Sequence, residues 1–212
     1  MRRSLIIFLK EPHPGRVKTR LGREIGMVEA AWWFRHQALA IIRRLAPDRR
    51  WRTVLALTPD AEGLASRIWP ARLPRIAQGP GDLGARMARV LATMPPGPAI
   101  VVGADIPALT RAQIAEGFRL LGRHEAVIGP AEDGGFWMIG LKRGARAAPA
   151  GFLAGVRWSG PHALTDALAT LGGLEVGWGP VLRDVDQAAD LRPPLSGGRS
   201  SLPPHPSPPE RG

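Results

Sequence analysis

Acidic side chains follow three of the apolar segments that the sequence predicts as strands. Asp105 comes after the residues Ile-Val-Val-Gly-Ala and shortly before a proline, which stops the strand. Asp133 lies in a Glu-Asp-Gly-Gly turn, and Asp184 and Asp186 lie near the end of the last predicted strand. Because open α/β sheets bind ligands at the carboxyl ends of their strands, we expect these aspartates to face one site.

Carboxylates in such a place suit a divalent metal. Mg²⁺ usually takes one or two carboxylates from a protein, since water and substrate phosphates complete its octahedron. Asp105, Asp184 and Asp186 would supply the ligands of Mg²⁺ or Mn²⁺ on a nucleotide diphosphate. Structural interpretations remain: Asp105 as a turn residue before proline, and Asp133 as part of a hairpin turn.

A basic, glycine-containing loop follows the first predicted strand. It contains Lys10, Gly15, Lys18 and Arg20, and its N–H groups and cations suit a diphosphate. Only three of the 29 basic residues are Lys, and two of them flank this loop, which indicates a need for a compact point charge. A P-loop is excluded because Val17, not glycine, precedes Lys18. The alternative is a basic surface loop without a ligand.

Other chemistries lack the residues that they need. The chain has no cysteine, and it shows no Ser-x-Gly elbow, histidine cluster or Rossmann glycine fingerprint. A transferase that stabilises a departing diphosphate through positioning and charge needs no covalent nucleophile. The acids and the basic loop therefore favour a metal-dependent transferase with a nucleotide-activated donor.

Strands and helices are expected to alternate through most of the chain, because apolar residues recur at strand or helix spacing. We expect strands over residues 4–9, 53–57, 75–78, 100–102, 126–129, 136–141, 174–178 and 181–185. We expect helices over residues 27–45, 61–68, 83–94 and 111–121, and one more that Ser159 caps and that carries Leu164, Leu168 and Leu171. Asp82 and Thr110 have the positions of helix caps. Residues 10–21 should form an ordered loop with neither helix nor sheet.

This alternation predicts a three-layer α/β/α sandwich with a mostly parallel sheet. The 212 residues are enough for one domain with a proper core. We place the domain at residues 1–192 and expect a disordered Pro/Ser/Gly-rich tail at residues 193–212.

The formal net charge of +11 raises the question of nucleic acid, but the arginines are scattered without a long run. We therefore expect a solvated basic surface and no nucleic-acid partner. The chain start resembles a signal peptide, yet Lys10 and Glu11 interrupt its apolar run early, and no stretch is long enough to span a bilayer. A cytoplasmic location is the default expectation.

Five motifs in this order carry a family resemblance. They are Lys10-x-Pro-x-Pro-Gly-x-Val-Lys-Thr-Arg-Leu21, Gln78-Gly with Asp82-Leu-Gly-x-Arg-Met87, Gly103-x-Asp-x-Pro107, Gly129-Pro-x-x-Asp-Gly-Gly135 and Asp184-Val-Asp186. Over residues 4–192 the chain resembles a bacterial family of the A-type glycosyltransferase (GT-A) superfamily. Its members are described as transferases associated with radical-SAM/selenodomain proteins, and some with arsenosugar biosynthesis. The fold is similar to that of nucleotide-diphospho-sugar transferases and phospholactate guanylyltransferases.

The resemblance implies roles for particular residues. Lys10, Gly15, Lys18 and Arg20 would face the phosphates of a nucleoside diphosphate sugar or nucleoside triphosphate, and Asp105 would hold the metal. Asp133 would lie at the sugar or acceptor, as a second metal ligand or as a general base. Contacts to the base and ribose would come from Gln78, Leu83 and Gly84. Trp158 either stacks on a sugar or packs in the core.

Three functions remain open at this point. The first is glycosyl transfer from a nucleoside diphosphate sugar to a small acceptor. The second is nucleotidyl transfer to a phosphorylated acceptor with release of pyrophosphate. The third is a basic binding protein without enzymatic activity, which would tolerate the loss of Asp105. If Asp105 and Lys18 lay at opposite edges of the sheet, both transferase functions would fail.

Overall fold

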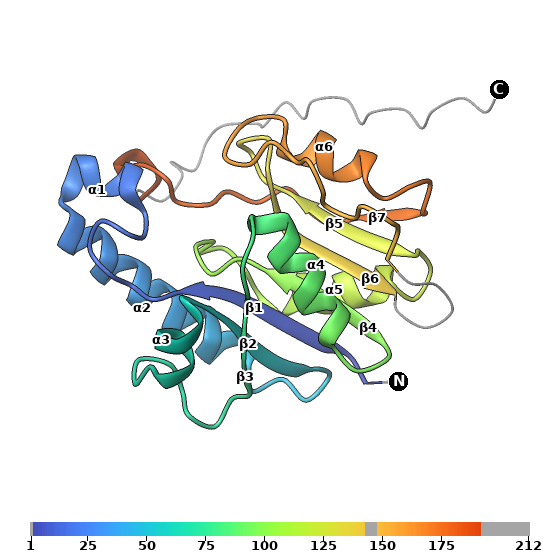
Figure 1. Cartoon of the computed structure of the whole chain (residues 1–212), viewed down its shortest axis with the longest axis horizontal. Coiled ribbons are helices and arrows are strands. Elements are labelled where there is room, and N and C mark those ends of the chain that lie inside the picture. The colour runs from blue at the N-terminus through green and yellow to red at the C-terminus, as the bar shows by residue number, and fades with distance from the viewer. Residues whose placement is uncertain (1, 143–147, 192–212) are drawn as a thin grey trace.

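A seven-stranded sheet forms the middle layer of the computed structural model (Figure 1). The structure describes residues 2–142 and 148–191, so the expected tail at 193–212 lies outside the described residues. The strands are β1 (Ser4–Lys10), β2 (Arg52–Thr58), β3 (Arg75–Ala77), β4 (Pro98–Val102), β5 (Ala126–Pro130), β6 (Phe136–Lys142) and β7 (Val176–Trp178). They lie in the order β3-β2-β1-β4-β6-β5-β7. β6 is antiparallel to β4 and β5, and the other described pairs are parallel, which confirms a mostly parallel sheet.

Helices cover both faces of this sheet (Figure 1). They are α1 (Thr19–Ile25), α2 (Met27–Leu45), α3 (Asp60–Ala65), α4 (Leu83–Thr93), α5 (Arg111–Leu120), α6 (Ala163–Ala169) and the 3-10 helix η1 (Ala188–Leu191). Along β1, Leu5 and Ile7 pack with α2 and α5, whereas Ile6 packs with α4 and α6. Since successive strand residues point to opposite faces, β1 is buried on both sides. The predicted α/β/α sandwich is confirmed.

Several local predictions hold because the responsible side chains act within their own segment. The helix predicted over residues 27–45 is α2, with Phe34, Ala38, Ile41 and Leu45 on its buried face. Asp82 caps α4 by accepting a hydrogen bond from the Ala85 N–H at 2.8 Å. Thr110 and Gln113 form a capping box at the start of α5.

Three local predictions are wrong. Residues 181–185 form no strand and make only one bridge, between Ala131 and Leu182. Ser159 caps no helix, since its φ of 65° is left-handed and α6 begins only at Ala163. The loop after β1 ends earlier than expected, because α1 starts at Thr19. Among the described residues, no helix has the length and apolar character needed to cross a membrane.

Candidate active site

The ammonium group of Lys18 joins the basic loop to the aspartates. Its Nζ lies 2.6 Å from an oxygen of Asp105, 3.4 Å from Asp186 and 3.7 Å from Asp184. The Lys18 side chain is 9% exposed, whereas the three carboxylates are partly exposed. Asp105 and Lys18 therefore lie at the same edge of the sheet, as the transferase functions require.

Arg20 extends this cluster of charges. Its Nη1 donates to Asp186 at 2.7 Å, and its Nη2 donates to the carbonyl oxygen of Ser159 at 3.3 Å. The guanidinium group thus links α1 to the segment before α6. Two of the four residues predicted to face phosphates, Lys18 and Arg20, are paired with predicted metal ligands.

Asp184 and Asp186 reach the site without a strand. The Leu182 N–H donates to Pro130 O at 3.1 Å, which leads the segment past the carboxyl end of β5. The Val185 N–H donates to Asp105 O at 3.2 Å, and the buried Val185 side chain packs against α1 and α2. Figure 1 shows the last described segment beside α1, far from it in sequence. These contacts place both acids next to Asp105.

Asp133 lies in the turn between β5 and β6. Its Oδ1 accepts a hydrogen bond from the Gly135 N–H at 2.9 Å, which is the hairpin use of an Asp-Gly turn. The turn packs closely on the segment before α6: a Cβ on Gly134 would lie 2.6 Å from Pro161. The Leu164 N–H also donates to Gly134 O at 3.0 Å. The hairpin thus holds Asp133 at the same edge as Asp105.

Burial and crowding change the ionisation of this cluster. Burial raises the pKa of Asp184 to about 6; the Lys18 cation opposes this effect, and the carboxylates of Asp105, Asp133 and Asp186 add to it. Burial would lower the pKa of Lys18, but its ion pair with Asp105 and the attraction of the other acids outweigh that effect and raise the pKa above its usual value. Four carboxylates thus face two cations, Lys18 and Arg20.

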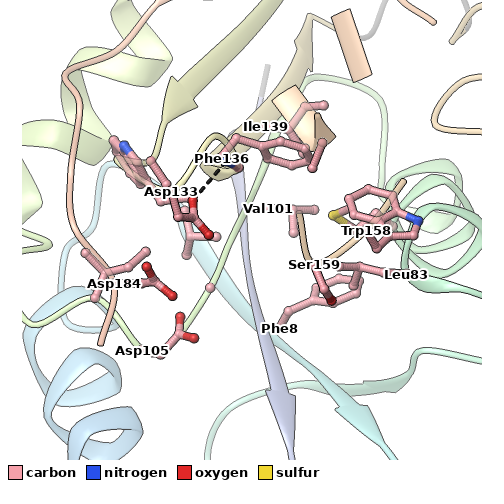
Figure 2. Close-up of a pocket in the computed structure, with 18 of the residues that line it drawn as sticks. Phe8, Leu83, Val101, Asp105, Asp133, Phe136, Ile139, Trp158, Ser159 and Asp184 are labelled. Atoms are coloured by element: carbon pink, nitrogen blue, oxygen red, sulfur yellow. Dashed lines mark hydrogen bonds between the residues drawn. The ribbon is translucent and has the colours of Figure 1, made fainter. Parts of the chain in front are cut away.

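Two adjoining spaces open beside these acids. The first is a cavity of about 270 Å³, in which Asp105, Asp133 and Asp184 lie on one side and mostly apolar residues on the other (Figure 2). The second, which we call the basic groove, holds about 470 Å³ and is lined by Lys10, Arg16, Lys18, Arg20 and their surroundings. The residues that line both spaces are Leu83, Asp105, Asp133, Ser159 and Asp184.

The structure places the remaining predicted site residues differently. Lys10 lines the basic groove with an exposed side chain, and Gly15 is exposed with a φ of 75°. The Gln78 amide is buried, and its Nε2 donates at 2.9 Å to Leu9 O and to Ala56 O, so its nitrogen links β1 to β2. Gln78 is 3% exposed and lines neither space, so the structure does not bring it to the cavity or to the basic groove.

Leu83 and Gly84 begin α4 at the boundary of the two spaces. The Leu83 side chain is 42% exposed and lines both. Gly84 is needed for packing, since a Cβ there would lie 2.2 Å from Leu153 O and 3.0 Å from the Trp158 ring. Leu83 is thus placed to contact a ligand, whereas Gly84 supports the cavity wall.

Sequence reasoning missed the buried Glu11. Its carboxylate accepts hydrogen bonds from Trp69 Nε1 at 2.5 Å and from Ser66 Oγ at 3.1 Å, which anchors the start of the basic loop. A single acid in a loop that otherwise carries cations was the signal that could have identified it. The apolar wall of the cavity was also missed, because its residues look like ordinary core residues in the sequence.

The fit of a metal can be judged from these side chains. Carboxylate oxygens and surplus negative charge suit Mg²⁺ or Mn²⁺. Within residues 2–142 and 148–191, however, no three acidic or histidine side chains are arranged to hold an ion. The Lys18 ammonium lies among Asp105, Asp184 and Asp186 instead. The carboxylate oxygens are suitable ligands for a divalent cation. In this structure, however, the ammonium group of Lys18 lies among them.

Solved structures with this fold include several nucleotide enzymes. A candidate nucleotide-diphospho-sugar transferase from Desulfovibrio desulfuricans G20 is 28% identical, with a TM-score of 0.79 over 90% of this chain and 85% of that chain. A 4-diphosphocytidyl-2C-methyl-D-erythritol synthase from Anaerococcus prevotii DSM 20548 is 10% identical, with a TM-score of 0.58 over 89% and 92%. Rv0371c from Mycobacterium tuberculosis H37Rv, solved in complex with manganese, is 15% identical, with a TM-score of 0.53 over 90% and 96%. These likenesses confirm the nucleotide-diphospho-sugar transferase type of fold.

Two further comparisons concern sequence. No curated protein matches the chain significantly. A family model described as "Uncharacterized protein conserved in bacteria (DUF2064)" matches residues 41–160, which is more than half of the chain and includes Asp105 and Asp133. The chain belongs to the DUF2064 family.

Proposed function

We propose that this protein is a metal-dependent transferase that moves a sugar from a nucleoside diphosphate to a small acceptor. The observation that carries the proposal is the ion pair between Lys18 and Asp105, at 2.6 Å. It brings the basic loop after β1 and the acid after β4 to one sheet edge, where the cavity and the basic groove meet. That edge is where open α/β sheets bind nucleotides.

The donor's diphosphate would lie in the basic groove. Lys10, Arg16, Lys18 and Arg20 line it and offer cations to the phosphate oxygens. Asp105, Asp184 and Asp186 would hold Mg²⁺ or Mn²⁺, and Lys18, which now pairs with them, would pair with phosphate. The bound cation would neutralise charge on the departing diphosphate.

The transfer itself needs only a proton acceptor and a stabilised leaving group. The bond between the sugar C1 and the diphosphate oxygen breaks, and its electron pair leaves with the nucleoside diphosphate. The acceptor oxygen bonds to C1, and its proton passes to the Asp133 carboxylate. Asp133 suits this role because it lines both spaces and is held in place by the Gly135 N–H.

Support also comes from the relative in Desulfovibrio desulfuricans, whose description names the same class of donor. The narrower assignment, to transferases associated with radical-SAM/selenodomain proteins and arsenosugar biosynthesis, rests on the motif resemblance alone. A cytoplasmic location belongs to the same proposal.

Nucleotidyl transfer is the second candidate. The fold is shared with the Anaerococcus synthase, whose name denotes a cytidyl compound. The same groove would then hold a nucleoside triphosphate, and the oxygen of a phosphorylated acceptor would attack the α-phosphate with release of pyrophosphate.

Product identification tests the proposal. The purified protein is incubated with nucleoside diphosphate sugars or nucleoside triphosphates, Mg²⁺ or Mn²⁺ and a mixture of acceptors, and the released species are assayed. Free nucleoside diphosphate, lost in Asp105→Asn, is the expected result. Pyrophosphate release would establish the second candidate. Full turnover in Asp105→Asn with metal still required would overturn the metal assignment.

A further inference from the structure

The two spaces beside the acids differ sharply in charge. The cations of the site, Lys10, Arg16, Lys18 and Arg20, line the basic groove, and none of them lines the cavity. Among the described residues that line the cavity, the ionisable ones are all acids: Asp105, Asp133 and Asp184. Since these three also line the groove, the boundary between the spaces is the row of carboxylates.

The rest of the cavity is largely apolar and comes from several elements. Phe8 of β1, Met87 of α4, Val101 of β4 and Ile139 of β6 line it together with Phe136 and Trp158. The Phe136 and Trp158 rings meet edge to face with centroids 5.9 Å apart. Figure 2 shows Val101, Phe136, Ile139 and Trp158 across the cavity from Asp105 and Asp184. A ligand here would meet aromatic and aliphatic walls and a carboxylate rim.

We propose that this cavity binds the acceptor, and that the acceptor is an uncharged hydroxyl compound with a compact apolar body, not a phosphate ester. The inference rests on the proposed function, because it takes the basic groove as the place of the donor. A donor diphosphate in the groove and an acceptor in the cavity would meet at Asp105, Asp133 and Asp184. The acceptor hydroxyl would donate its hydrogen bond to Asp133.

The negative charge on the cavity lining disfavours a phosphorylated acceptor. A phosphate monoester carries close to two negative charges at neutral pH, and the described residues that line the cavity include three carboxylates and no cation. Like charges in a space partly shielded from water repel more strongly than in bulk solvent. An uncharged apolar body gains instead from leaving water.

A matched pair of probes tests the inference. Benzyl alcohol and benzyl phosphate are titrated into the full chain by ligand-observed NMR, once with a chelator and once with excess Mg²⁺. We expect the alcohol to bind at least tenfold more tightly than the ester in both conditions. With the chelator all three carboxylates repel the ester, and with Mg²⁺ Asp133, which is not among the proposed metal ligands, still repels it. Equal or tighter binding of the ester in either condition overturns the inference.

Two variants locate the probe. Trp158→Ala removes an aromatic wall of the cavity, and the control Trp32→Ala removes a tryptophan that is 62% exposed and lines neither space. Alcohol binding should weaken about tenfold in the first and stay unchanged in the second. Gly160→Leu is a second cavity variant, since Gly160 lines the cavity and a Cβ there would meet nothing within 4 Å. Unchanged alcohol binding in either cavity variant that folds overturns the inference.

A separate measurement keeps this test apart from the proposed function. Uridine, guanosine, cytidine and adenosine diphosphates, each with Mn²⁺, are titrated into wild type and Gly160→Leu. Nucleotide binding that survives in the variant while alcohol binding is lost supports two distinct spaces. Loss of both in a folded variant would mean that the nucleotide occupies the cavity, which overturns the inference while nucleotide use stands. Binding of alcohol without any binding of nucleotide would overturn the proposed function.

Discussion

Lys18 stands in a backbone conformation that non-glycine residues rarely adopt. Its φ of 45° and ψ of 47° are left-handed, at a cost of about 1–2 kcal/mol. Val17 beside it is buried against Ala31 and Phe34, which fixes the chain at this point. The ion pairs with three carboxylates offset this cost. The left-handed conformation thus places the Lys18 ammonium group next to the carboxylates.

Removal of that cation should destabilise the fold. Lys18→Met leaves Asp105, Asp184 and Asp186 without their shared partner, and we expect the free energy of unfolding to fall by about 2–4 kcal/mol. Urea unfolding measures the change. Lys142→Met is the control, because Lys142 is exposed and its Nζ donates only to Gly122 O among the bonds described. Equal free energies of unfolding in the two variants would show that the ion pairs of Lys18 contribute nothing to stability.

Asp184 should make stability depend on pH in the chelated protein. Its folded-state pKa of about 6 exceeds the ordinary 3.8, so the folded state holds the proton more tightly than the unfolded state does. The stabilisation is complete below about pH 3.8 and is lost as pH rises through about 6. Asp184→Asn should therefore be more stable than wild type above pH 6, by about 1–2 kcal/mol after allowance for its partial exposure.

The measurement for Asp184 is thermal unfolding of both proteins from acid to neutral pH in the presence of a chelator. The difference between variant and wild type should shrink toward zero as the pH approaches the ordinary carboxyl pKa. A constant difference across this range would mean that Asp184 ionises as it does in the unfolded chain.

At the scale of elements, the β5–β6 hairpin positions Asp133 by packing on the segment that leads into α6. Gly134 has a φ of 84°, and a Cβ there would lie within 2.6–2.9 Å of Pro161 backbone atoms. The close approach leaves no room for a side chain, so a residue other than glycine would push the turn away from the segment before α6.

Gly134→Ala should therefore lower the free energy of unfolding by more than the strain of a left-handed alanine alone would. Gly155→Ala is the matched control, because Gly155 also has a positive φ, 71°, but a Cβ there would meet nothing within 4 Å. We expect a loss of about 1 kcal/mol for the control and at least twice that for Gly134→Ala, measured by urea unfolding. Similar losses would refute the claim that the turn is held by Pro161.

Sequence reasoning succeeded at this scale wherever a segment's own residues decide its structure. Asp82 and the Thr110–Gln113 capping box set helix starts through bonds to neighbouring residues. The continuous apolar run that forms β1 was clear in the sequence, and its residues Leu5, Ile6 and Ile7 are all buried. Asp105 and the basic loop were also correctly expected to meet, because the parallel strands β1 and β4 bring their ends to one edge.

Sequence reasoning failed where contacts with distant segments determine the local structure. Two prolines and a glycine predicted a loop through residue 21, yet α1 begins at Thr19, and Leu21 packs with Ala30 and Val185. Residues 181–185 look like a strand, but their bonds to Pro130, Glu132 and Asp105 draw them across the end of the sheet. The Gln78 amide donates hydrogen bonds to the carbonyl oxygens of Leu9 and Ala56. No local sequence pattern predicts a hydrogen bond between residues so far apart in the chain.

For the molecule as a whole, the strand order explains why the site forms where it does. The chain builds β1, β2 and β3 toward one side and then places β4 on the other side of β1. The connections after β1 and β4 therefore diverge, and a crevice opens between them at the carboxyl edge. The loop with Lys18 follows β1, and Asp105 follows β4, so both border this crevice.

The central claim is that this crevice binds a nucleotide together with a divalent metal through Asp105. Thermal unfolding of wild type, Asp105→Asn and the control Asp48→Asn is compared with uridine, guanosine, cytidine and adenosine diphosphates, each with and without Mn²⁺. Asp48 pairs with Arg50 and lines neither space of the site. The account predicts that at least one nucleotide stabilises wild type and Asp48→Asn only when Mn²⁺ is present, and that Asp105→Asn loses this shift. The same metal-dependent shift in Asp105→Asn, or no shift with any nucleotide in wild type, would contradict it.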